Sequence, residues 1–392
     1  MRSLEIFGGC GGLALGLSRA GFTRKVLIER DGHAVQTLVY NQQRGVRHFC
    51  EWDVVEADVC GFAFDKLGTN LDLVSGGPPC QPFSIGGKHL GPADHRNLWP
   101  EAIRAVKETR PKAFIFENVQ GLLRPAFQEY LRYIVLQLRW PSRTKPKSLS
   151  WQQHAIQLSS LDEASPDLRE YQIDVKGINA ADYGAAQKRH RAIVVGVRSD
   201  ISSTCQIPNP THSQASLTWD KYISGDYWIR HGIDPGKSAG PSATEARLVA
   251  QLRQLDERPN LGAWTTARDR LSSLGAPLDG GQDPNHYQRP GARRYRNHTG
   301  SLADEPAKAL KAGAHGVPGG ENMLVQSDNS VRYFTVREMA RLQGFPDEFI
   351  ATGSWRHVTR QLGNAVPAEI GEAIGSYIAG IIASAVSTRI AA

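Results

Sequence analysis

The chain has 392 residues, enough for two or three domains of ordinary size. With 40% hydrophobic and 22% charged residues it has the composition of a globular protein, and Lys and Arg outnumber Asp and Glu by 46 to 39, which is compatible with a polyanionic partner. Five scattered cysteines indicate neither a disulfide framework nor a zinc site, so we expect no metal and a reducing compartment.

Five segments predict strands of a mostly parallel α/β sheet. They are LEIF (4–7), VLIE (26–29), LDLV (71–74), AFIFE (113–117) and AIVVGV (192–197), with helical periodicity between them, as in LWPEAIRAVKE (98–108). Apolar strands that alternate with helices are typical of a parallel sheet covered on both faces. Because Arg2 leads straight into the first strand, we expect no signal peptide.

A glycine-rich turn, FGGCGG (7–12), follows the first strand and precedes a helix. Glycines there let the backbone approach a ligand and leave helix N–H groups free to bind it. The spacing is not the GxGxxG of dinucleotide sites, although such turns serve several nucleotide-like ligands. Glu29 ends the second strand, where a carboxylate commonly accepts ribose hydroxyls, and Asp53 is expected to end a third, weaker strand. A solvated strand end explains either carboxylate equally well.

The stretch SGGPPCQPFS (75–84) places Cys80 among prolines and glycines just beyond a predicted strand. Most free cysteines are buried structural thiols. Here the irregular backbone lies where open α/β sheets bind ligands, beyond the carboxyl ends of their strands. We therefore interpret Cys80 as a nucleophile, because the thiolate is the strongly nucleophilic form of a cysteine.

Two further motifs border predicted strands. Glu117, in ENV (117–119), follows AFIF beside the expected cleft, where it can donate or accept a proton. Gln187, Arg189 and Arg191 alternate along the extended segment before AIVVGV, so we expect them to share one face. Two guanidinium groups there would hold anionic or carbonyl oxygens, although each residue alone is more often part of a surface ion pair.

The regions after residue 140 differ from the first part of the chain in composition and hydrophobic pattern. Residues 140–170 are polar and broken by prolines, which indicates an insertion or a mobile surface connection. Residues 199–330 are rich in glycine and proline and carry an arginine cluster, YQRPGARRYRNHTG (287–300), which indicates a separate loop-rich domain. TVRE (335–338) predicts a capping box. The isoleucine-rich segment 370–386 predicts an amphipathic core helix rather than a membrane span.

Taken in order, these motifs resemble those of the cytosine-C5 DNA methyltransferases, which carry FxGxGG, PCQ, ENV, QxRxR, a variable region, RxxGFP and GNxVP. The corresponding segments here are FGGCGG, Pro79-Cys80-Gln81, Glu117-Asn118-Val119, Gln187/Arg189/Arg191, RLQGFPDEF (341–349) and GNAVP (363–367). The resemblance implies a Rossmann-like fold that uses S-adenosylmethionine. Residues 1–198 and 331–392 would form its catalytic, cofactor-binding domain, and 199–330 a smaller target-recognition domain.

The resemblance also assigns the chemistry. Cys80 would attack C6 of a flipped cytosine so that C5 accepts a methyl group. Glu117 would contact the N3/N4 edge and supply a proton, while Arg191, with Arg189 close by, would hold O2. The substrate contacts would also include Pro79, Gln81, Ser84, Asn118, Gln187, Arg293, Arg294 and Arg296.

For S-adenosylmethionine, the resemblance points to Glu5, Phe7, Gly9, Cys10, Gly11, Glu29, Asp53, Asn364 and Val366. Glu29 would bind the ribose and Asp53 the adenine amine. Glu5 stands where the family commonly has aspartate, so its contact with the methionine ammonium is a departure from the pattern.

The function so implied is that of a DNA (cytosine-5-)-methyltransferase acting on a specific sequence in double-stranded DNA. We expect a monomer, without membrane association, in the bacterial cytoplasm at the nucleoid, with a separately encoded restriction endonuclease. The tRNA-methylating branch of the family is an alternative, disfavoured by the long variable region. Intact Cys80, Glu117 and Arg191 speak against a catalytically dead regulatory homologue, and the glycine spacing speaks against a dinucleotide oxidoreductase.

Overall fold

The computed structural model describes residues 1–69, 71–79, 97–237, 240–277, 283, 285–295, 299–313 and 322–391. The chain divides into two compact units. The first comprises Met1–Ile178, His190–Pro208 and Asp347–Ala392, and the second Asn179–Arg189 and Asn209–Pro346. The boundaries expected at 198/199 and 330/331 therefore need correction. Residues 199–208 belong to the first unit, whereas 179–189 and 331–346 belong to the second.

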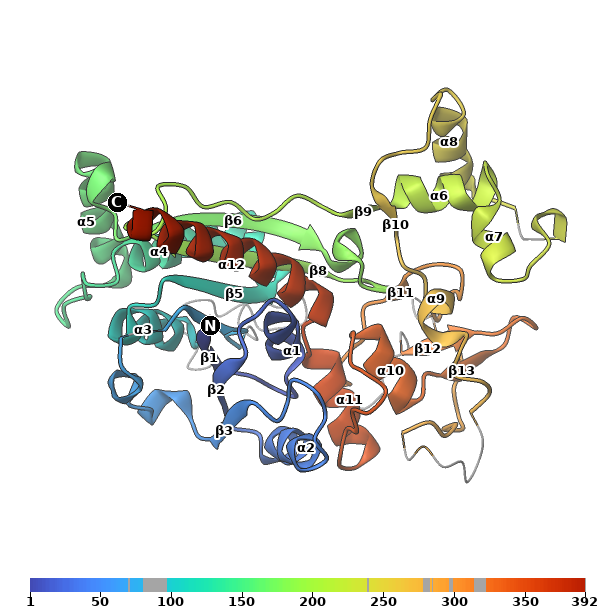
Figure 1. Ribbon diagram of the computed structural model, residues 1–392, viewed down its shortest axis with the longest axis horizontal. Helices are drawn as coiled ribbons and strands as arrows, with labels where there is room; N and C mark the ends of the chain where they lie inside the picture. Colours follow the sequence, from blue (N-terminus) through green and yellow to red (C-terminus); the bar gives the residue numbers. More distant parts are fainter. Residues whose placement is uncertain are drawn as a thin grey trace. The chain divides into compact units, whose positions relative to one another are not determined.

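The first unit is built on a seven-stranded sheet in the order β3-β2-β1-β4-β5-β8-β6 (Figure 1). The strands are β1 (Arg2–Ile6), β2 (Arg24–Glu29), β3 (Trp52–Glu56), β4 (Leu73–Gly76), β5 (Ala113–Val119), β6 (Tyr171–Asn179) and β8 (His190–Arg198). The first five pair in parallel, and β8 runs antiparallel to β5. All five predicted strands are present, and the mostly parallel α/β class is confirmed.

The helices of the first unit cover this sheet. They are α1 (Gly12–Arg19), α2 (Gly32–Gln43), α3 (Trp99–Thr109), α4 (Gln128–Arg139), α5 (Trp151–Ala164), α11 (Trp355–Asn364) and α12 (Ala368–Ala391). One core cluster joins the sheet residues Phe114 and Phe116 to Trp99 of α3 and Ile134 of α4, all of them fully buried. Large apolar side chains therefore fix one face of the sheet against α3 and α4.

Helices α1 and α12 meet backbone to backbone. A Cβ atom on Gly16 would lie 2.0 Å from the carbonyl oxygen of Ala368, and one on Gly371 would lie 2.8 Å from that of Leu13. Only glycine allows so close an approach. The predicted core-packing face of α12 is confirmed, because Ile370, Ile374, Ile378 and Ile382 are buried. By length and mean hydropathy (1.4) alone, Trp355–Ser387 among the described helices would also qualify as a membrane span.

The region 140–170 is more regular than expected. Helix α5 begins with a capping box, in which Ser150 accepts from the Gln153 amide and the Gln153 side chain accepts from the Ser150 amide. Asp162, near its end, accepts from Trp140 Nε1 (3.1 Å) and pairs with Arg139 and Arg169. The prediction of an irregular connection is wrong for Trp151 to Ala164, which form α5. The capping box at Ser150 and the contacts of Asp162 stabilise this helix.

The second unit has short strands and short helices. Its helices are α6 (Gln214–Tyr222), α7 (Asp226–Arg230), α8 (Ala243–Leu252), α9 (Ala267–Leu271) and α10 (Val336–Leu342). Its strands are β7 (Gln187–Lys188), β9 (His212–Ser213), β10 (Gly262–Ala263), β11 (Ala307–Lys308), β12 (Met323–Val325) and β13 (Val331–Tyr333). The predicted capping box at the start of α10 is confirmed, with Thr335 and Glu338 bonding reciprocally.

A chain of ion pairs centred on one buried lysine joins the parts of the second unit. The Lys221 ammonium, 4% exposed, lies 3.0 Å from Glu245 Oε1 and 2.9 Å from Glu305 Oε1. Glu305 also pairs with Lys188 of β7 at 2.8 Å. Because a buried charge is tolerated only when paired, these residues fix α6, α8 and β7 to one another.

Candidate active site

The predicted motifs of the first unit gather where its parallel strands end. β1, β2, β4 and β5 end at Ile6, Glu29, Gly76 and Val119, and we call this edge of the sheet the carboxyl edge. In open α/β sheets ligands bind beyond this edge. The register confirms the alignment, because Ile6 is paired with Ile28 on one side and with Gly76 on the other.

The glycine-rich turn has the backbone that its sequence indicates. Phe7 (φ 58°), Gly9 (φ 54°) and Gly11 (φ 89°) all have positive φ. For a large residue such as phenylalanine this conformation costs about 1–3 kcal/mol and is often found at functional sites. A Cβ on Gly12 would lie 2.3 Å from the carbonyl oxygen of Val366, whereas one on Gly9 would meet no described atom within 4 Å. The turn is therefore packed against the 365–367 segment and open at Gly9.

Two carboxylates of this edge are held by backbone amides. Glu29 accepts from the amides of Gly9 (2.8 Å), Arg30 (2.8 Å) and Asp31 (2.7 Å). Glu5, 1% exposed, accepts from the Ala14 amide in the first turn of α1 (3.1 Å) and from Ser75 Oγ (3.2 Å). Helix N-terminal amides stabilise a negative charge, which explains how a glutamate is accommodated in this interior position.

Cys10 and the GNAVP segment lie beside the same turn. Cys10 is fully buried with its Sγ 3.6 Å from the carbonyl oxygen of Gln361, and burial raises the pKa of its thiol to about 12. Cys10 is therefore a protonated, packed thiol. Val366 is buried against Gly12, whereas Asn364 is exposed at the end of α11.

The placement predicted for Asp53 is wrong. β3 begins at Trp52, and Asp53 pairs with Val26, so it lies at the end of the sheet remote from Glu29. The carboxylate that follows β3 is Asp58, which accepts from the Cys60 amide (3.0 Å) and pairs with Arg30 (3.0 Å). Asp58 was not among the predicted residues, because it lies two positions beyond the strand, whereas Glu29 is the last residue of β2.

Glu117 and Arg191 form an ion pair at the end of β5. In the antiparallel pairing of β5 with β8, Glu117 lies opposite Ile193 and Arg191 lies opposite Val119. Residues two positions apart on a strand point to the same face, so the two side chains meet diagonally across the strands. The Arg191 Nε contacts Glu117 Oε1, and both side chains are mostly buried. The pair places a carboxylate and a guanidinium side by side, as the predicted chemistry requires.

Asn118 fixes the segment that leads into Cys80. Its Nδ2 donates to the carbonyl oxygen of Pro78 at 3.2 Å, and its Oδ1 accepts from the Val119 amide. The ends of β4 and β5 are thus tied together immediately before Pro79. Cys80, Gln81, Ser84 and Arg296 lie outside the described residues.

Gln187 and Arg189 belong to the second unit, and both are buried there. The Gln187 side chain donates to the carbonyl oxygen of Leu342 (3.2 Å) and accepts from the Leu310 amide (3.1 Å). Arg189 donates to the carbonyl oxygen of Leu310 (3.0 Å). Both side chains therefore hold the second unit together.

The described residues of the predicted arginine cluster lie on the surface of the second unit. Arg294 donates to Asn329 Oδ1 (2.8 Å) in the turn between β12 and β13. The Arg293 guanidinium lies 5.6 Å from the centre of the Tyr295 ring. Both arginines keep their charge within reach of solvent, where a phosphate could be bound.

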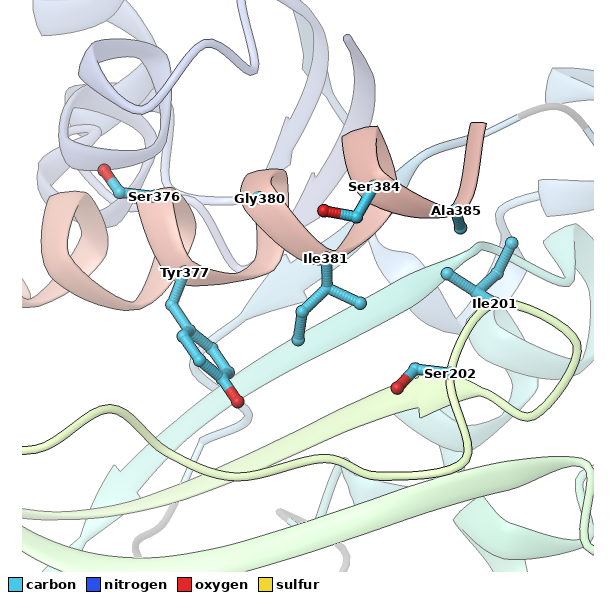
Figure 2. Close-up of a pocket in the computed structure, with 8 residues that line it drawn as sticks. All are labelled: Ile201, Ser202, Ser376, Tyr377, Gly380, Ile381, Ser384 and Ala385. Carbon is cyan, nitrogen blue, oxygen red and sulfur yellow. The ribbon is translucent and has the colours of Figure 1, made fainter. Parts of the chain in front are cut away.

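A separate hollow of about 550 Å³ lies in the first unit between α12 and the turn after β8. Tyr377 and Ile381 point from α12 toward Ile201 and Ser202 (Figure 2). Because β8 is antiparallel to β5, its last residues lie at the opposite edge of the sheet from Glu117. No residue predicted for the active site lines this hollow.

The comparison with protein families decides the identity of the chain. The family model described as C-5 cytosine-specific DNA methylase matches residues 1–140 and 148–380. The chain belongs to this family. It is a DNA cytosine-5 methyltransferase, which excludes the oxidoreductase and the purely regulatory alternatives.

Individual relatives agree with this assignment. The chain is 30% identical to the Type II methyltransferase M.NgoMIV of Neisseria gonorrhoeae, with 96% of each chain covered. It is 31% identical to M.PspPI of a Psychrobacter species, with 96% of this chain and 78% of the relative covered. This methyltransferase is of the Type II restriction–modification type.

Solved structures show the same fold. Schizosaccharomyces pombe Dnmt2 superposes with a TM-score of 0.54 at 17% identity, covering 98% of this chain and 99% of that one. A putative DNA modification methyltransferase encoded within an Escherichia coli prophage gives a TM-score of 0.51 at 22% identity, with 98% and 99% covered. The Rossmann-like methyltransferase fold expected from the motifs is confirmed.

Proposed function

We propose that the carboxyl edge of the first unit methylates C5 of a cytosine that is flipped out of a specific duplex sequence, through a covalent bond between Cys80 and C6. One observation carries the proposal. The Asn118–Pro78 hydrogen bond holds the segment before Cys80 beside the Glu117–Arg191 pair. Cys80 follows Pro78 by two positions in the sequence, so a nucleophile at Cys80 would act together with the proton donor and the cation of this pair.

The residues divide the reaction between them. The Cys80 thiolate adds to C6, while Glu117 gives a proton to N3 and Arg191 holds O2, so that the electron pair displaced from C6 makes C5 nucleophilic. After C5 has gained the methyl group, a base from solvent removes its proton, the C6–S bond breaks with its electron pair leaving on Cys80 as the thiolate, and N3 returns its proton to Glu117. Because C6 is stacked in the duplex, the cytosine must first be turned out of the helix.

The glycine-rich turn fits S-adenosylmethionine, which supplies an electrophilic methyl group when bound. Gly9 faces open space, and the Glu29 carboxylate ends β2 with its orientation fixed by three amides. Glu29 would bind the ribose hydroxyls, and Asp58, in place of Asp53, the adenine amine. Glu5 would face the methionine ammonium. Phe7 and Asn364, which are not buried, would complete the walls of the site, and the buried Cys10, Gly11 and Val366 would pack behind them.

The second unit would read the target sequence. Its exposed Arg293 and Arg294, with Arg296, would contact phosphates and base edges, and the buried Gln187 and Arg189 would hold the unit in shape. The enzyme would act as a monomer at the nucleoid of a bacterial cytoplasm, protecting sites that a separately encoded endonuclease cleaves.

Methyl transfer from tritiated S-adenosylmethionine tests the proposal with duplex DNA and tRNA offered in parallel. We expect label in DNA cytosine, none with Cys80→Ala or Cys80→Ser, and a covalent complex between the wild type and a fluorocytosine duplex. Bisulfite sequencing of the product then gives the target sequence. Label in tRNA alone overturns the duplex substrate, and full activity of Cys80→Ala overturns the covalent mechanism.

A further inference from the structure

The connection between α4 and α5 is the part of the first 380 residues that the family model does not match, since the match stops at 140 and resumes at 148. It carries the sequence PSRTKPK, and residues 142–148 are all exposed. Arg143, Lys145 and Lys147 come from this loop, and Lys107 of α3 joins them by donating to Thr144 Oγ1 at 2.7 Å. We call these four cations the basic loop patch.

The loop that carries the patch is held in one shape. The Arg143 amide donates to the carbonyl oxygen of Trp140 (2.9 Å), and the Lys145 ammonium donates to that of Leu149 (2.7 Å). Its two ends are anchored by the Trp140–Asp162 hydrogen bond and by the Ser150 cap of α5. A ligand that binds here therefore orders little additional chain, which favours affinity.

The acids around the patch are already neutralised. Glu108, next to Lys107 in α3, pairs with Arg104, and Asp162, which anchors the loop through Trp140, pairs with Arg139 and Arg169. Glu170 accepts from Ser142 of the loop and lies 3.8 Å from Arg110. Over the part of the chain that the structure describes, no carboxylate lies within 4.0 Å of the four patch cations. The patch thus presents uncompensated positive charge, which attracts a polyanion.

The patch lies at the opposite edge of the sheet from the candidate active site. α3 and α4 both run back from the carboxyl edge, so that Lys107 and the α4–α5 connection lie near Ala113, where β5 begins. Glu117 and Asn118 lie at the other end of this strand, and seven residues of strand span about 23 Å. The patch and the candidate active site are therefore separate surfaces of the first unit, about one strand length apart.

From this geometry we propose that the basic loop patch binds the phosphates of a second DNA segment, independently of sequence, while the first segment occupies the carboxyl edge. Lys and Arg bind phosphate without reading bases, and each contact releases counterions. The enzyme can then pass from one duplex segment to another without first dissociating into solution.

The binding of a second DNA segment can be tested by measuring how a competitor duplex changes the rate at which the first duplex dissociates. The wild type is bound to a short fluorescent duplex, and unlabelled duplex of random sequence is added at rising concentration. We expect the observed dissociation rate to rise with competitor concentration, and to become independent of it in the variant Lys107→Gln/Arg143→Gln/Lys145→Gln/Lys147→Gln. The second duplex should bind that variant about tenfold or more weakly at low salt, with a slope of log K against log[salt] reduced by about 3–4.

Two matched variants control for a general loss of positive charge and for the substitutions themselves. Arg44→Gln/Arg47→Gln/Lys66→Gln/Arg132→Gln removes the same charge from exposed positions elsewhere in the first unit and should keep the competitor dependence. Lys107→Arg/Lys145→Arg/Lys147→Arg keeps the charge of the patch, so its dissociation rate should also still depend on the competitor concentration. A wild-type rate that does not depend on competitor overturns the proposal, as does equal loss in the Arg44 set. Loss seen only when the first duplex is long would show that the same segment reaches the patch, which also overturns it. This assay measures binding, so it stands apart from the covalent chemistry of Cys80.

Discussion

The two units of this methyltransferase are stabilised by different means. In the first, a seven-stranded sheet buries large apolar side chains such as Phe114, Phe116 and Trp99 completely. In the second, the strands have two or three residues, one apolar cluster gathers around Tyr227 and Trp228, and a buried charge, that of Lys221, joins α6 to α8. The residues proposed for catalysis therefore lie on a sheet that is held by apolar packing. The unit proposed to read DNA is held more by ion pairs, which a single substitution can remove.

The largest effect on activity is expected in the first unit, at Glu117. Glu117→Gln keeps the shape of the side chain but removes the proton donor, so the rate of methyl transfer should fall about 10²- to 10⁴-fold. Single-turnover methylation of duplex DNA measures this rate. Cofactor affinity, measured by calorimetry, should change little because Glu29 is untouched. A rate within tenfold of wild type would remove Glu117 from the chemistry.

Removal of the Lys221 charge should destabilise the second unit. Lys221→Met leaves Glu245 without its cation in a largely buried position and leaves Glu305 paired with Lys188 alone, at a cost of about 3 kcal/mol in local stability. Hydrogen exchange should become faster in α6 and α8 and stay unchanged in β5. Adding Glu305→Gln should restore part of the protection, and Lys66→Met, at an exposed site, should change nothing. Equal acceleration in β5 would mean that the two units do not differ in this way.

The first unit should be sensitive to volume instead of charge. Gly16→Ala forces a methyl group against the backbone of α12 and should lower the free energy of unfolding by about 1–3 kcal/mol. Gly380→Ala is the matched control, because nothing lies within 4 Å of its Cβ position, and it should stabilise α12 by about 0.5–1 kcal/mol. Thermal unfolding distinguishes them; identical melting temperatures would contradict the close contact of α1 with α12.

The smallest effect is expected from acid at Glu245 of the second unit. Burial by itself would raise the pKa of Glu245, but hydrogen bonds from Ser242 and the Lys221 ammonium outweigh it and lower this pKa to about 2. A lowered carboxyl pKa contributes stability that is present above its ordinary value of 4.5 and is lost as the pH falls towards 2. Hydrogen exchange in α8, corrected for intrinsic rates, should increase over this interval, and Glu245→Gln should flatten the dependence. Persistence of the dependence in that variant would assign it to another group.

The sequence predicted those parts of the molecule whose structure is set by local pattern. Continuous apolar runs located five strands, and the glycines of FGGCGG located the turn between β1 and α1. Asp53 was misplaced because WDVVE has no apolar run, so that only its pairing with β2 shows where the strand begins. The unit boundaries could not be predicted either. Gln187 and Arg189 join the second unit through contacts with Leu310 and Leu342, more than 100 residues away in the chain.

The contact between α1 and α12 also bears on how the chain is made. The glycine-rich turn packs on Val366, and α2 is bonded to Ile350 and Thr352 through Asn41 and Thr37. A nascent chain that has reached residue 200 therefore carries Glu117 and Arg191 but has one side of α1 uncovered. The glycine-rich turn, which is proposed to bind S-adenosylmethionine, is completed only after the whole second unit has been synthesised. A chain that stops early lacks the residues that pack on this turn, so truncated chains should not methylate DNA.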